Sequence, residues 1–350
     1  MMRAVLEQLV RGEDLSGERM RAVFEQLMAG ELTDAQIAAF LAALACKRPS
    51  SEELAAAAAV MREKVTTVPV GVDAIDTCGT GGDARSTFNV STCAAIIAAG
   101  AGAYVAKHGN KTNTRVSGSA EAFAALGVNI DAEVPVVARC IEEAHVGFCF
   151  AIKLHPAMKY AAPVRRAMAI KTIFNFLGPL TNPAHVKRQV IGVPNADETE
   201  LVCDALRRLG AERAMVVHAM ERLCDISIAG PTRISELRDG TVRTYVTRPE
   251  ELGLSASSLD AIMVESPQQS AERIGEILAG KKGPCRDIAA VNAAAALVVA
   301  GLADDLKTGL RLAVESIDSG AARAALAVLR SVALWQGLRK RVLGGRGPPH

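Results

Sequence analysis

The first seventy residues carry apolar side chains at helical spacing and almost no strand pattern. Leu6 and Leu9 begin one apolar stripe, further stripes begin at Met20 and Ile37, and a run of alanines follows Ser50. Residues three or four positions apart lie on one face of a helix, so this pattern predicts four helices. We therefore expect a small all-helical domain at the start of the chain.

From residue 74 the pattern changes to short apolar runs that end in glycine-rich turns and are followed by helical stretches. This alternation is typical of a mainly parallel sheet surrounded by helices. It predicts strands over 74–78, 103–106, 147–152, 190–193, 214–218 and 225–228. The predicted fold class is thus α/β, with a small all-helical domain plus a larger α/β domain.

One segment interrupts the alternation. Residues 158–169 have a helical pattern, whereas 174–180 are rich in turn-forming residues. We expect residues 158–186 to rejoin the N-terminal helices in space. The predicted domains are then 1–70 with about 158–186 for the helical domain, 71–157 with 187–343 for the α/β domain, and 344–350 for a flexible tail rich in Gly and Pro.

The composition narrows the classes of function. Of 350 residues, 50% are hydrophobic and 3% aromatic, and 40 Lys and Arg against 38 Asp and Glu give a net charge of +2. Proteins that bind nucleic acid or acidic membranes usually carry a strong basic excess, so we expect neither partner. The eight cysteines contain no C-x-x-C pair, which favours reduced thiols and a cytoplasmic location.

The most informative segment follows the first predicted strand and reads Asp76-Thr77-Cys78-Gly79-Thr80-Gly81-Gly82-Asp83. Its glycines allow backbone N–H groups to face an anion, and the helix that starts near Thr92 adds partial positive charge. Such a turn can also be only a tight connection. No lysine completes a P-loop, and the next strand ends in Lys107, where a dinucleotide site would place an acid. A phosphate fits this loop better than a ribose diol, and Asp83 would then contact a sugar hydroxyl, a substrate amine or Mg²⁺.

A second polar segment follows the next predicted strand. It concentrates Lys107, Lys111 and Arg115 among small hydrogen-bonding side chains and leads into a helix near Ser119. An isolated cation cluster is usually a solvated surface, but this cluster lies at the carboxyl end of a strand beside the first loop. Two adjacent anion loops imply a ligand with two phosphate groups.

In these residues the chain resembles the anthranilate phosphoribosyltransferase family, which has a nucleoside phosphorylase-like phosphoribosyltransferase fold. The matching motifs run in family order along almost the whole chain: Gly79-Thr80-Gly81-Gly82-Asp83, Asn89-Val90-Ser91-Thr92, Lys107-His108-Gly109-Asn110, Gly118-Ser119-Ala120, His155-Pro156-Ala157-Met158-Lys159, Phe174-Asn175-x-Leu177-Gly178-Pro179-Leu180-x-Asn182-Pro183, and Gln189-Val190-Ile191-Gly192-Val193.

The resemblance implies transfer of the phosphoribosyl group of 5-phosphoribosyl diphosphate (PRPP) to the amine of anthranilate, assisted by Mg²⁺, in tryptophan biosynthesis. It also implies a homodimer joined through the helical domain. The residues implied to hold PRPP are Gly79, Gly82, Asp83, Thr87, Asn89, Val90, Ser91, Thr92, Lys107, His108, Gly109, Asn110, Lys111, Thr112, Asn113, Thr114, Arg115 and Ser119. Those implied to contact anthranilate are Gly79, Asn110 and Arg165, with His108 and His155 lining its route, and those implied for the metal are Ser91 and Asp225, with Cys224 beside them.

The chemistry of this reaction agrees with these residue types. Breaking the anomeric bond of PRPP builds positive charge on the ribose and negative charge on pyrophosphate, so we expect stabilisation by Lys107 and Asn110 and no dedicated acid or base. Arg165 would orient the carboxylate of anthranilate through a bidentate pair. Taken alone, Arg165 could be a surface cation and His155 a buried structural histidine.

Departures from the family pattern leave alternatives open. The family has Asp where this chain has Cys224, a soft ligand that Mg²⁺ disfavours, so Asp225 is the hard ligand that remains. Lys111 and Lys171 stand in place of arginines, and Glu121 in place of Asp. The alternatives are a related phosphoribosyltransferase or nucleoside phosphorylase-like enzyme with another acceptor, and a non-catalytic homologue that binds PRPP.

Overall fold

The computed structural model describes residues 1–82, 85–112 and 116–343, with the backbone alone for 335–343. Of the residues predicted to bind PRPP, Asp83, Asn113, Thr114 and Arg115 lie outside the described residues, as does the tail predicted over 344–350. Within the described ranges, no helix is both long and apolar enough to cross a membrane.

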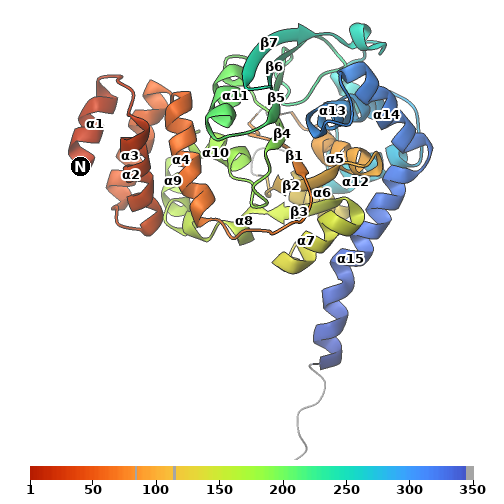
Figure 1. The fold of residues 1–350 in the computed structure, drawn as a ribbon, viewed down its shortest axis with the longest axis horizontal. Coiled ribbons are helices and arrows are strands. Elements are labelled where there is room, and N and C mark those ends of the chain that lie inside the picture. Colours follow the sequence, from red (N-terminus) through yellow and green to blue (C-terminus); the bar gives the residue numbers. More distant parts are fainter. Residues whose placement is uncertain (83–84, 113–115, 344–350) are drawn as a thin grey trace, which may run out of the picture.

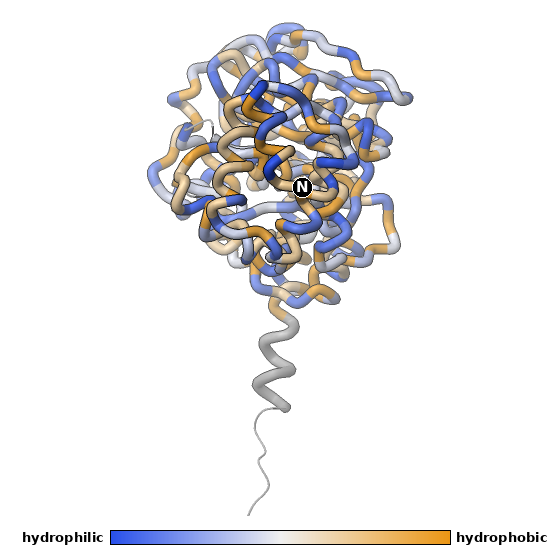
Figure 2. The backbone as a smooth tube through the Cα atoms, turned by 90° about the vertical axis from the view of Figure 1, so that its left-hand side faces the viewer, coloured by the Kyte–Doolittle hydropathy of each residue, from blue (hydrophilic) through white to orange (hydrophobic). Residues whose placement is uncertain are grey.

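Four helices form the N-terminal part, at one end of the molecule (Figure 1). They are α1 (Met2–Val10), α2 (Gly17–Ala29), α3 (Asp34–Lys47) and α4 (Ser51–Lys64). Thr33 and Ser50 begin α3 and α4 with reciprocal side-chain and backbone hydrogen bonds to the third residue of each helix. Hydrophobic and hydrophilic positions alternate along these helices, which face the viewer in Figure 2. The predicted helical domain is confirmed.

The larger part contains a seven-stranded sheet with the strand order β3-β2-β1-β4-β5-β6-β7. The strands are β1 (Ala74–Gly79), β2 (Tyr104–Gly109), β3 (Val146–Phe150), β4 (Arg188–Gly192), β5 (Arg213–Ala219), β6 (Thr232–Arg238) and β7 (Thr241–Thr247). Strands β1 to β5 are parallel, and β6 and β7 add an antiparallel hairpin at one edge. The prediction of an α/β fold with a mainly parallel sheet is confirmed.

Helices connect the strands and cover both faces of the sheet (Figure 1). They are α5 (Val90–Gly100), α6 (Ser119–Ala125), α7 (Val134–Ala144), α8 (Ala151–Leu154), η1 (Pro156–Lys159), α9 (Ala162–Met168), α10 (Phe174–Leu180), α11 (Glu198–Arg208), η2 (Pro249–Leu252), η3 (Leu259–Ile262), α12 (Pro267–Leu278), α13 (Pro284–Ala300), α14 (Leu306–Asp318) and α15 (Ala321–Leu343).

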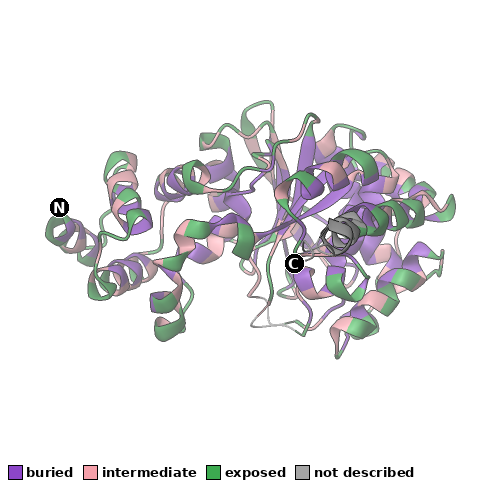
Figure 3. Ribbon diagram, turned by 90° about the horizontal axis from the view of Figure 1, so that it is seen from below, coloured by how far each residue is buried: buried purple, intermediate pink, exposed green. Residues whose placement is uncertain are grey.

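Each face of the sheet has its own apolar core. In β5, Met215 and Val217 belong to one core, whereas Ala214 and Val216 belong to the other, because successive side chains of a strand point to opposite faces. The first core includes α5, α13 and α15, and the second joins α11 to the N-terminal helices. Buried residues accordingly run through the middle of the molecule (Figure 3).

The segment from α9 to α10 packs beside the N-terminal helices. Val164, Phe174 and Leu177 share the apolar core of those helices, and the rings of Phe24 and Phe174 lie 5.8 Å apart. Two stretches of chain that are distant in sequence therefore meet in this part of the molecule. The domain boundaries at 1–70 and about 158–186 stay a prediction.

Residues 174–180 form helix α10, whereas the sequence predicted turns. Phe174, Leu177 and Leu180 are buried at intervals of three residues, which places them on one face of a helix. Pro179 lies one residue before the end of α10, where it interrupts only the last turn. The turn-forming residues therefore shorten the helix without preventing it.

The prediction of a strand over 225–228 is wrong, because these residues form no strand. The backbone of Ile226 pairs instead with the side chain of Asn292 in α13, through Ile226 N to Asn292 Oδ1 and Asn292 Nδ2 to Ile226 O, both at 2.9 Å. Ser227 N donates to Thr232 Oγ1 at 2.9 Å. Side chains thus satisfy a buried backbone that would otherwise need a neighbouring strand.

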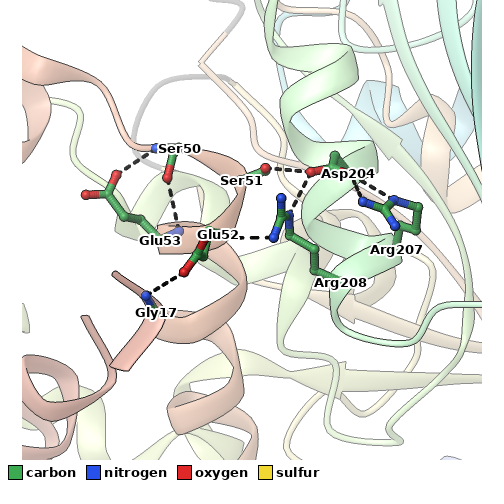
Figure 4. Close-up of polar contacts among 8 residues, drawn as sticks. All are labelled: Gly17, Ser50, Ser51, Glu52, Glu53, Asp204, Arg207 and Arg208. Atoms are coloured by element: carbon green, nitrogen blue, oxygen red, sulfur yellow. Dashed lines mark hydrogen bonds and ion pairs between the residues drawn. The ribbon is translucent and has the colours of Figure 1, made fainter. Parts of the chain in front are cut away.

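Polar contacts between α4 and α11 join the N-terminal helices to the α/β part (Figure 4). Ser51 Oγ donates to Asp204 Oδ2 at 2.6 Å, and Arg208 lies 3.9 Å from Glu52 Oε2. Burial raises the pKa of Asp204, but hydrogen bonds from Ser51, Arg208 and Arg207 outweigh this effect and hold the pKa at about 2. The Asp204 carboxylate therefore stays ionised at neutral pH and accepts the hydrogen bond from Ser51 that connects α4 to α11.

Candidate active site

The two polar loops lie side by side at the carboxyl edge of the sheet. The first loop follows Gly79 at the end of β1, and the second follows Gly109 at the end of β2, its neighbour. On the other side of β1, Gly79 pairs in register with Gly192 of β4. Parallel sheets bind ligands at this edge, so the structure brings the predicted loops together.

Close backbone packing holds the first loop in place. A Cβ atom on Gly192 would lie 1.7 Å from Cys224 O, so only glycine allows the loop after β5 to rest on the end of β4. Thr80 N donates to Gly192 O at 2.9 Å and is therefore not a free donor for an anion. Gly81 and Gly82 have φ values of 67° and 88°, a conformation that favours glycine.

Helix α5 begins beside this loop with a capped N-terminus. Asn89 Oδ1 accepts a hydrogen bond from Thr92 N at 3.0 Å and another from Ser91 Oγ at 3.3 Å. Asn89 is the N-cap residue of this 11-residue helix, and such a terminus favours an anionic ligand. The side chain of Ser91 is half-buried, whereas Asn89 and Thr92 are buried.

A buried charged pair lies beneath the two loops. Asp76 and Lys107 are both 0% exposed. Lys107 Nζ donates to Thr77 O and, at 3.1 Å, to Ser91 Oγ. Burial raises the pKa of Asp76 and lowers the pKa of Lys107, while the attraction between the two charges opposes both shifts. The ammonium of Lys107 thus acts on the site through its hydrogen bonds to Thr77 O and Ser91 Oγ.

Asn182 anchors this pair, and the predictions did not include it. Its Nδ2 donates to Asp76 Oδ2 and to Ala106 O, both at 2.8 Å. His108 N donates to Asp76 Oδ1 at 3.0 Å. Asn182 belongs to the matched motif that ends at Pro183, which was its sequence signal, but the contact with Asp76 joins residues 106 positions apart and could not be predicted from that motif.

Two histidines form a buried pair with defined tautomers. His108 Nδ1 lies 2.9 Å from Gly178 O, and a carbonyl only accepts, so Nδ1 carries the hydrogen. His108 Nε2 is then the acceptor for His155 Nε2–H at 3.1 Å. Burial lowers the pKa of His108 to about 3, with a smaller effect from His155, and lowers the pKa of His155 to about 4. Both rings are therefore neutral at pH 7.

The residues predicted to contact anthranilate are spread over several elements. Arg165 in α9 is half-buried, and its guanidinium lies 4.9 Å from the centre of the Phe174 ring. It makes no ion pair with any residue in the described part of the chain, and burial lowers its pKa. Asn110 is exposed, and its Oδ1 accepts from Lys111 N at 2.8 Å. Lys171 Nζ donates to Gly82 O at 3.2 Å, which links the segment after α9 to the first loop.

The other residues predicted for PRPP differ in their exposure. The buried ones are Thr87, Asn89, Val90, Thr92, Lys107 and His108; the half-buried ones are Gly82, Ser91, Gly109, Thr112 and Ser119; the exposed ones are Gly79, Asn110 and Lys111. Thr112 N donates to Glu121 Oε1 at 3.3 Å, so α6 holds the second loop.

The oxygen atoms of Ser91 and Asp225 suit a metal ion whose remaining ligands are waters and substrate phosphates. The Asp225 side chain is 7% exposed, and its charge is one of those that raise the pKa of Lys107. Lys107 in turn donates a hydrogen bond to Ser91 Oγ, so the Asp225 carboxylate and the Ser91 hydroxyl both lie near the Lys107 ammonium. Cys224 Sγ lies 4.0 Å from Gly81 O. No group of three His, Cys, Asp or Glu side chains within the described ranges could hold a metal. Mg²⁺ typically binds one or two carboxylates together with waters and substrate phosphates, so Ser91 and Asp225 fit it and Cys224 does not.

Comparisons with known proteins agree with this geometry. Residues 3–65 match the model of the helical bundle domain of a glycosyl transferase family, and residues 71–323 match the a/b domain of that family. The fold and the paired loops thus define a glycosyltransferase with an N-terminal helical bundle.

Individual relatives define the family more closely. The chain is 48% identical over 324 residues to the anthranilate phosphoribosyltransferase of Anaeromyxobacter dehalogenans, with 92% of this chain and 96% of the relative covered. It is 46% identical to the enzyme of Methylobacillus flagellatus, with 94% and 97% covered. This chain belongs to the anthranilate phosphoribosyltransferase family.

Solved structures show the same architecture. The crystal structure of anthranilate phosphoribosyltransferase from Thermus thermophilus has a TM-score of 0.89 and 38% identity, with 94% of this chain and 99% of that chain covered. The enzyme from Saccharomyces cerevisiae in complex with PRPP and Mg has a TM-score of 0.85 and 25% identity, with 95% and 97% covered.

Proposed function

We propose that this protein transfers the phosphoribosyl group of PRPP to the amine of anthranilate, giving N-(5-phosphoribosyl)anthranilate and pyrophosphate in tryptophan biosynthesis. The observation that carries the proposal is the pair of polar loops at the ends of β1 and β2, beside the capped N-terminus of α5. A ligand with a phosphate and a diphosphate needs two such anion sites close together.

The loops and the start of α5 hold PRPP in this proposal. Gly82, residues 89–92 and the segment from Lys107 to Thr112 line the proposed site, with Thr87 and Ser119 at the margins. In the first turn of α5 the proposed backbone donors are those of Val90 and Ser91, because Asn89 N and Thr92 N already donate to Ser270 Oγ and Asn89 Oδ1. Asp83, Asn113, Thr114 and Arg115 complete the proposed set. Lys107 stabilises the leaving diphosphate from below, and Asn110 from the exposed side of the loop.

The acceptor lies against Gly79, Asn110 and Arg165 in this proposal. Arg165 has its guanidinium free of carboxylate partners in the described residues and pairs with the carboxylate of anthranilate. His108 and His155 line the approach as neutral rings. The arylamine is already a neutral nucleophile at pH 7, so its orientation matters more than a strong base.

Mg²⁺ is part of the proposal, and the chemistry that it supplies is neutralisation of the charge that develops on the diphosphate. Ser91 and Asp225 are the protein groups that would hold it. We further propose a homodimer joined through the helical part, and a cytoplasmic location based on the cysteine pattern.

The direct test follows the fluorescence of anthranilate after PRPP is added, with and without Mg²⁺. We expect the fluorescence to fall only when PRPP and Mg²⁺ are both present. In Arg165→Ala, loss of the carboxylate contact should raise the KM for anthranilate roughly tenfold to a hundredfold, the equivalent of about 1.5–3 kcal/mol for a charged hydrogen bond. Exposed Arg166→Ala is the matched control on the same helix.

Two other results would contradict the proposal. Turnover of PRPP with a different acceptor, but not with anthranilate, would identify a related transferase. Binding of PRPP without consumption of any acceptor would identify a non-catalytic homologue.

A further inference from the structure

A cavity lies between the β6–β7 hairpin and the start of α14, at the edge of the sheet. Its volume is about 460 Å³, which is within the range typical of small-molecule sites. In the sheet order β6 lies three strands away from β1, a distance of roughly 14 Å at the usual strand spacing. The cavity is therefore separate from the proposed active site.

Part of the lining of this cavity is apolar. Met215 of β5 and Val298 of α13 are buried residues of the lining, and Leu252 and Leu306 add two further aliphatic side chains. The ring of Tyr245 in β7 borders the same space. Such a lining favours a ligand that brings an aliphatic or aromatic group of its own, because burial of that group removes apolar surface from water.

A half-buried carboxylate, that of Glu236 in β6, borders the apolar lining. Tyr245 Oη donates to Glu236 Oε2 at 3.0 Å. Burial, and to a smaller extent the charge of Glu236 and this hydrogen bond, raise the pKa of Tyr245, so the phenol keeps its hydrogen. Arg243 lies opposite Glu236 in β7, but Glu236 makes no ion pair with it or with any other residue in the described part of the chain. Oε1 of Glu236 thus remains as a charged acceptor.

Arg238 supplies the opposite charge on the same face of β6. Residues two positions apart on a strand point to one face and are separated by roughly 7 Å. Arg238 Nη1 donates to Asp304 O at 3.2 Å, and within the described ranges the guanidinium makes no ion pair, with Glu236 or with another carboxylate. An arginine has five N–H donors, so most of them remain for a ligand.

The charges around the cavity favour a ligand with a cationic group. The carboxylates of the lining are Glu236, Glu251, Asp304 and Asp305, and its cations are Arg238 and Lys307. This excess of negative charge disfavours a simple anion such as phosphate. An ammonium group would instead form a charge-assisted hydrogen bond with the carboxylate that has no cationic partner.

We propose that this cavity is a binding site for a free α-amino acid with a hydrophobic side chain. The ammonium of the ligand pairs with Glu236 and its carboxylate with Arg238, while its side chain lies against the apolar lining. The ammonium and the carboxylate are attached to one carbon atom, and with a hydrogen bond of about 3 Å at each end they span a gap close to the spacing of these two residues. The inference does not depend on the proposed reaction.

The test is calorimetric titration of the full chain with L-phenylalanine and with L-leucine, for both of which we expect measurable binding. Glu236→Gln keeps an acceptor for Tyr245 but removes the charge, so the Kd for both amino acids should rise roughly tenfold to a hundredfold. Arg238→Gln should have a similar effect. Glu200→Gln is the matched control, because Glu200 pairs with Arg233 on the other face of β6, and its Kd values should equal those of the wild type.

Two analogues test the charges without any substitution. 3-Phenylpropionate lacks the ammonium and phenethylamine lacks the carboxylate, so each should bind at least about tenfold more weakly than L-phenylalanine. Arg165→Ala should bind L-phenylalanine as tightly as the wild type does, which distinguishes the cavity from the proposed anthranilate site.

Four results would overturn the inference: no binding of either amino acid at about 10 mM, phenethylamine binding as tight as that of L-phenylalanine, an unchanged Kd in folded Glu236→Gln, or loss of L-phenylalanine binding in Arg165→Ala. Consumption of anthranilate with PRPP is measured separately, and its absence would contradict only the proposed function.

Discussion

Cys224 places a sulfur atom where the proposed site needs hard oxygen ligands. Its backbone rests on Gly192 and its Sγ lies 4.0 Å from Gly81 O, so the residue is part of the floor of the first loop. Mg²⁺ prefers oxygen to sulfur. At the scale of residues, Cys224 is thus the position where a single change should improve the proposed metal site.

We expect Cys224→Asp to lower the Mg²⁺ concentration required for half-maximal turnover, roughly tenfold if the new carboxylate contributes about 1.4 kcal/mol. The measurement is initial rate against Mg²⁺ concentration at saturating PRPP. Cys224→Ala is the control, because it removes the thiol without adding an oxygen ligand or a charge. An unchanged Mg²⁺ dependence in Cys224→Asp would contradict the idea that Cys224 weakens the site.

At the scale of elements, the middle of β1 and the middle of β2 are held together by Asn182, which follows α10. Its amide donates to Asp76 in β1 and to Ala106 in β2, and its Oδ1 accepts from Ala184 N at 2.8 Å. One buried side chain thus fixes the relative position of the two strands that carry the loops.

Asn182→Ala should lower the free energy of unfolding by roughly 2–4 kcal/mol, because it leaves a buried carboxylate oxygen and a buried carbonyl without this partner. Urea unfolding measures the change. Asn129→Ala removes a half-buried asparagine whose Nδ2 donates to Ala333 O in α15 at 3.3 Å, and it should cost about 1 kcal/mol or less. Equal losses in the two variants would show that Asn182 has no special role at this junction.

The sequence predicted the local features well and the distant pairings poorly. The loops after β1 and β2 were predictable because glycines, cations and helix caps are adjacent along the chain. The partners of Asp76 and Ile226 were not, because Asn182 and Asn292 lie 106 and 66 positions away. The apolar pattern of 225–228 is the same for a strand and for a buried segment that side chains satisfy, so it could not distinguish them.

At the scale of the whole molecule, the two histidines connect the elements that would bind PRPP with the elements that would bind anthranilate. His108 is the penultimate residue of β2, His155 precedes η1, and the carbonyl of Gly178 belongs to α10. Both rings stay neutral because burial lowers their pKa values to about 3 and about 4. The junction therefore depends on histidines that resist protonation.

This junction should make the protein less stable in mild acid. An unfolded histidine has a pKa near 6.5, so between pH 6.5 and about 4 the unfolded chain binds more protons and the free energy of unfolding falls as pH falls. The slope is at most about 1.4 kcal/mol per pH unit for each histidine. Urea unfolding at several pH values should show a shallower slope in His155→Gln than in the wild type, and equal slopes would contradict this account.

The shared core between the N-terminal helices and α11 has a consequence for the order of events during synthesis. The helices end at Lys64, but their apolar partners include Leu206, Val216 and Leu237. At about 5–20 residues per second, a ribosome needs roughly 10–30 s to reach those partners. Throughout that interval the first four helices expose the face that later packs against the sheet, so we expect the nascent chain, more than the finished enzyme, to be prone to aggregation.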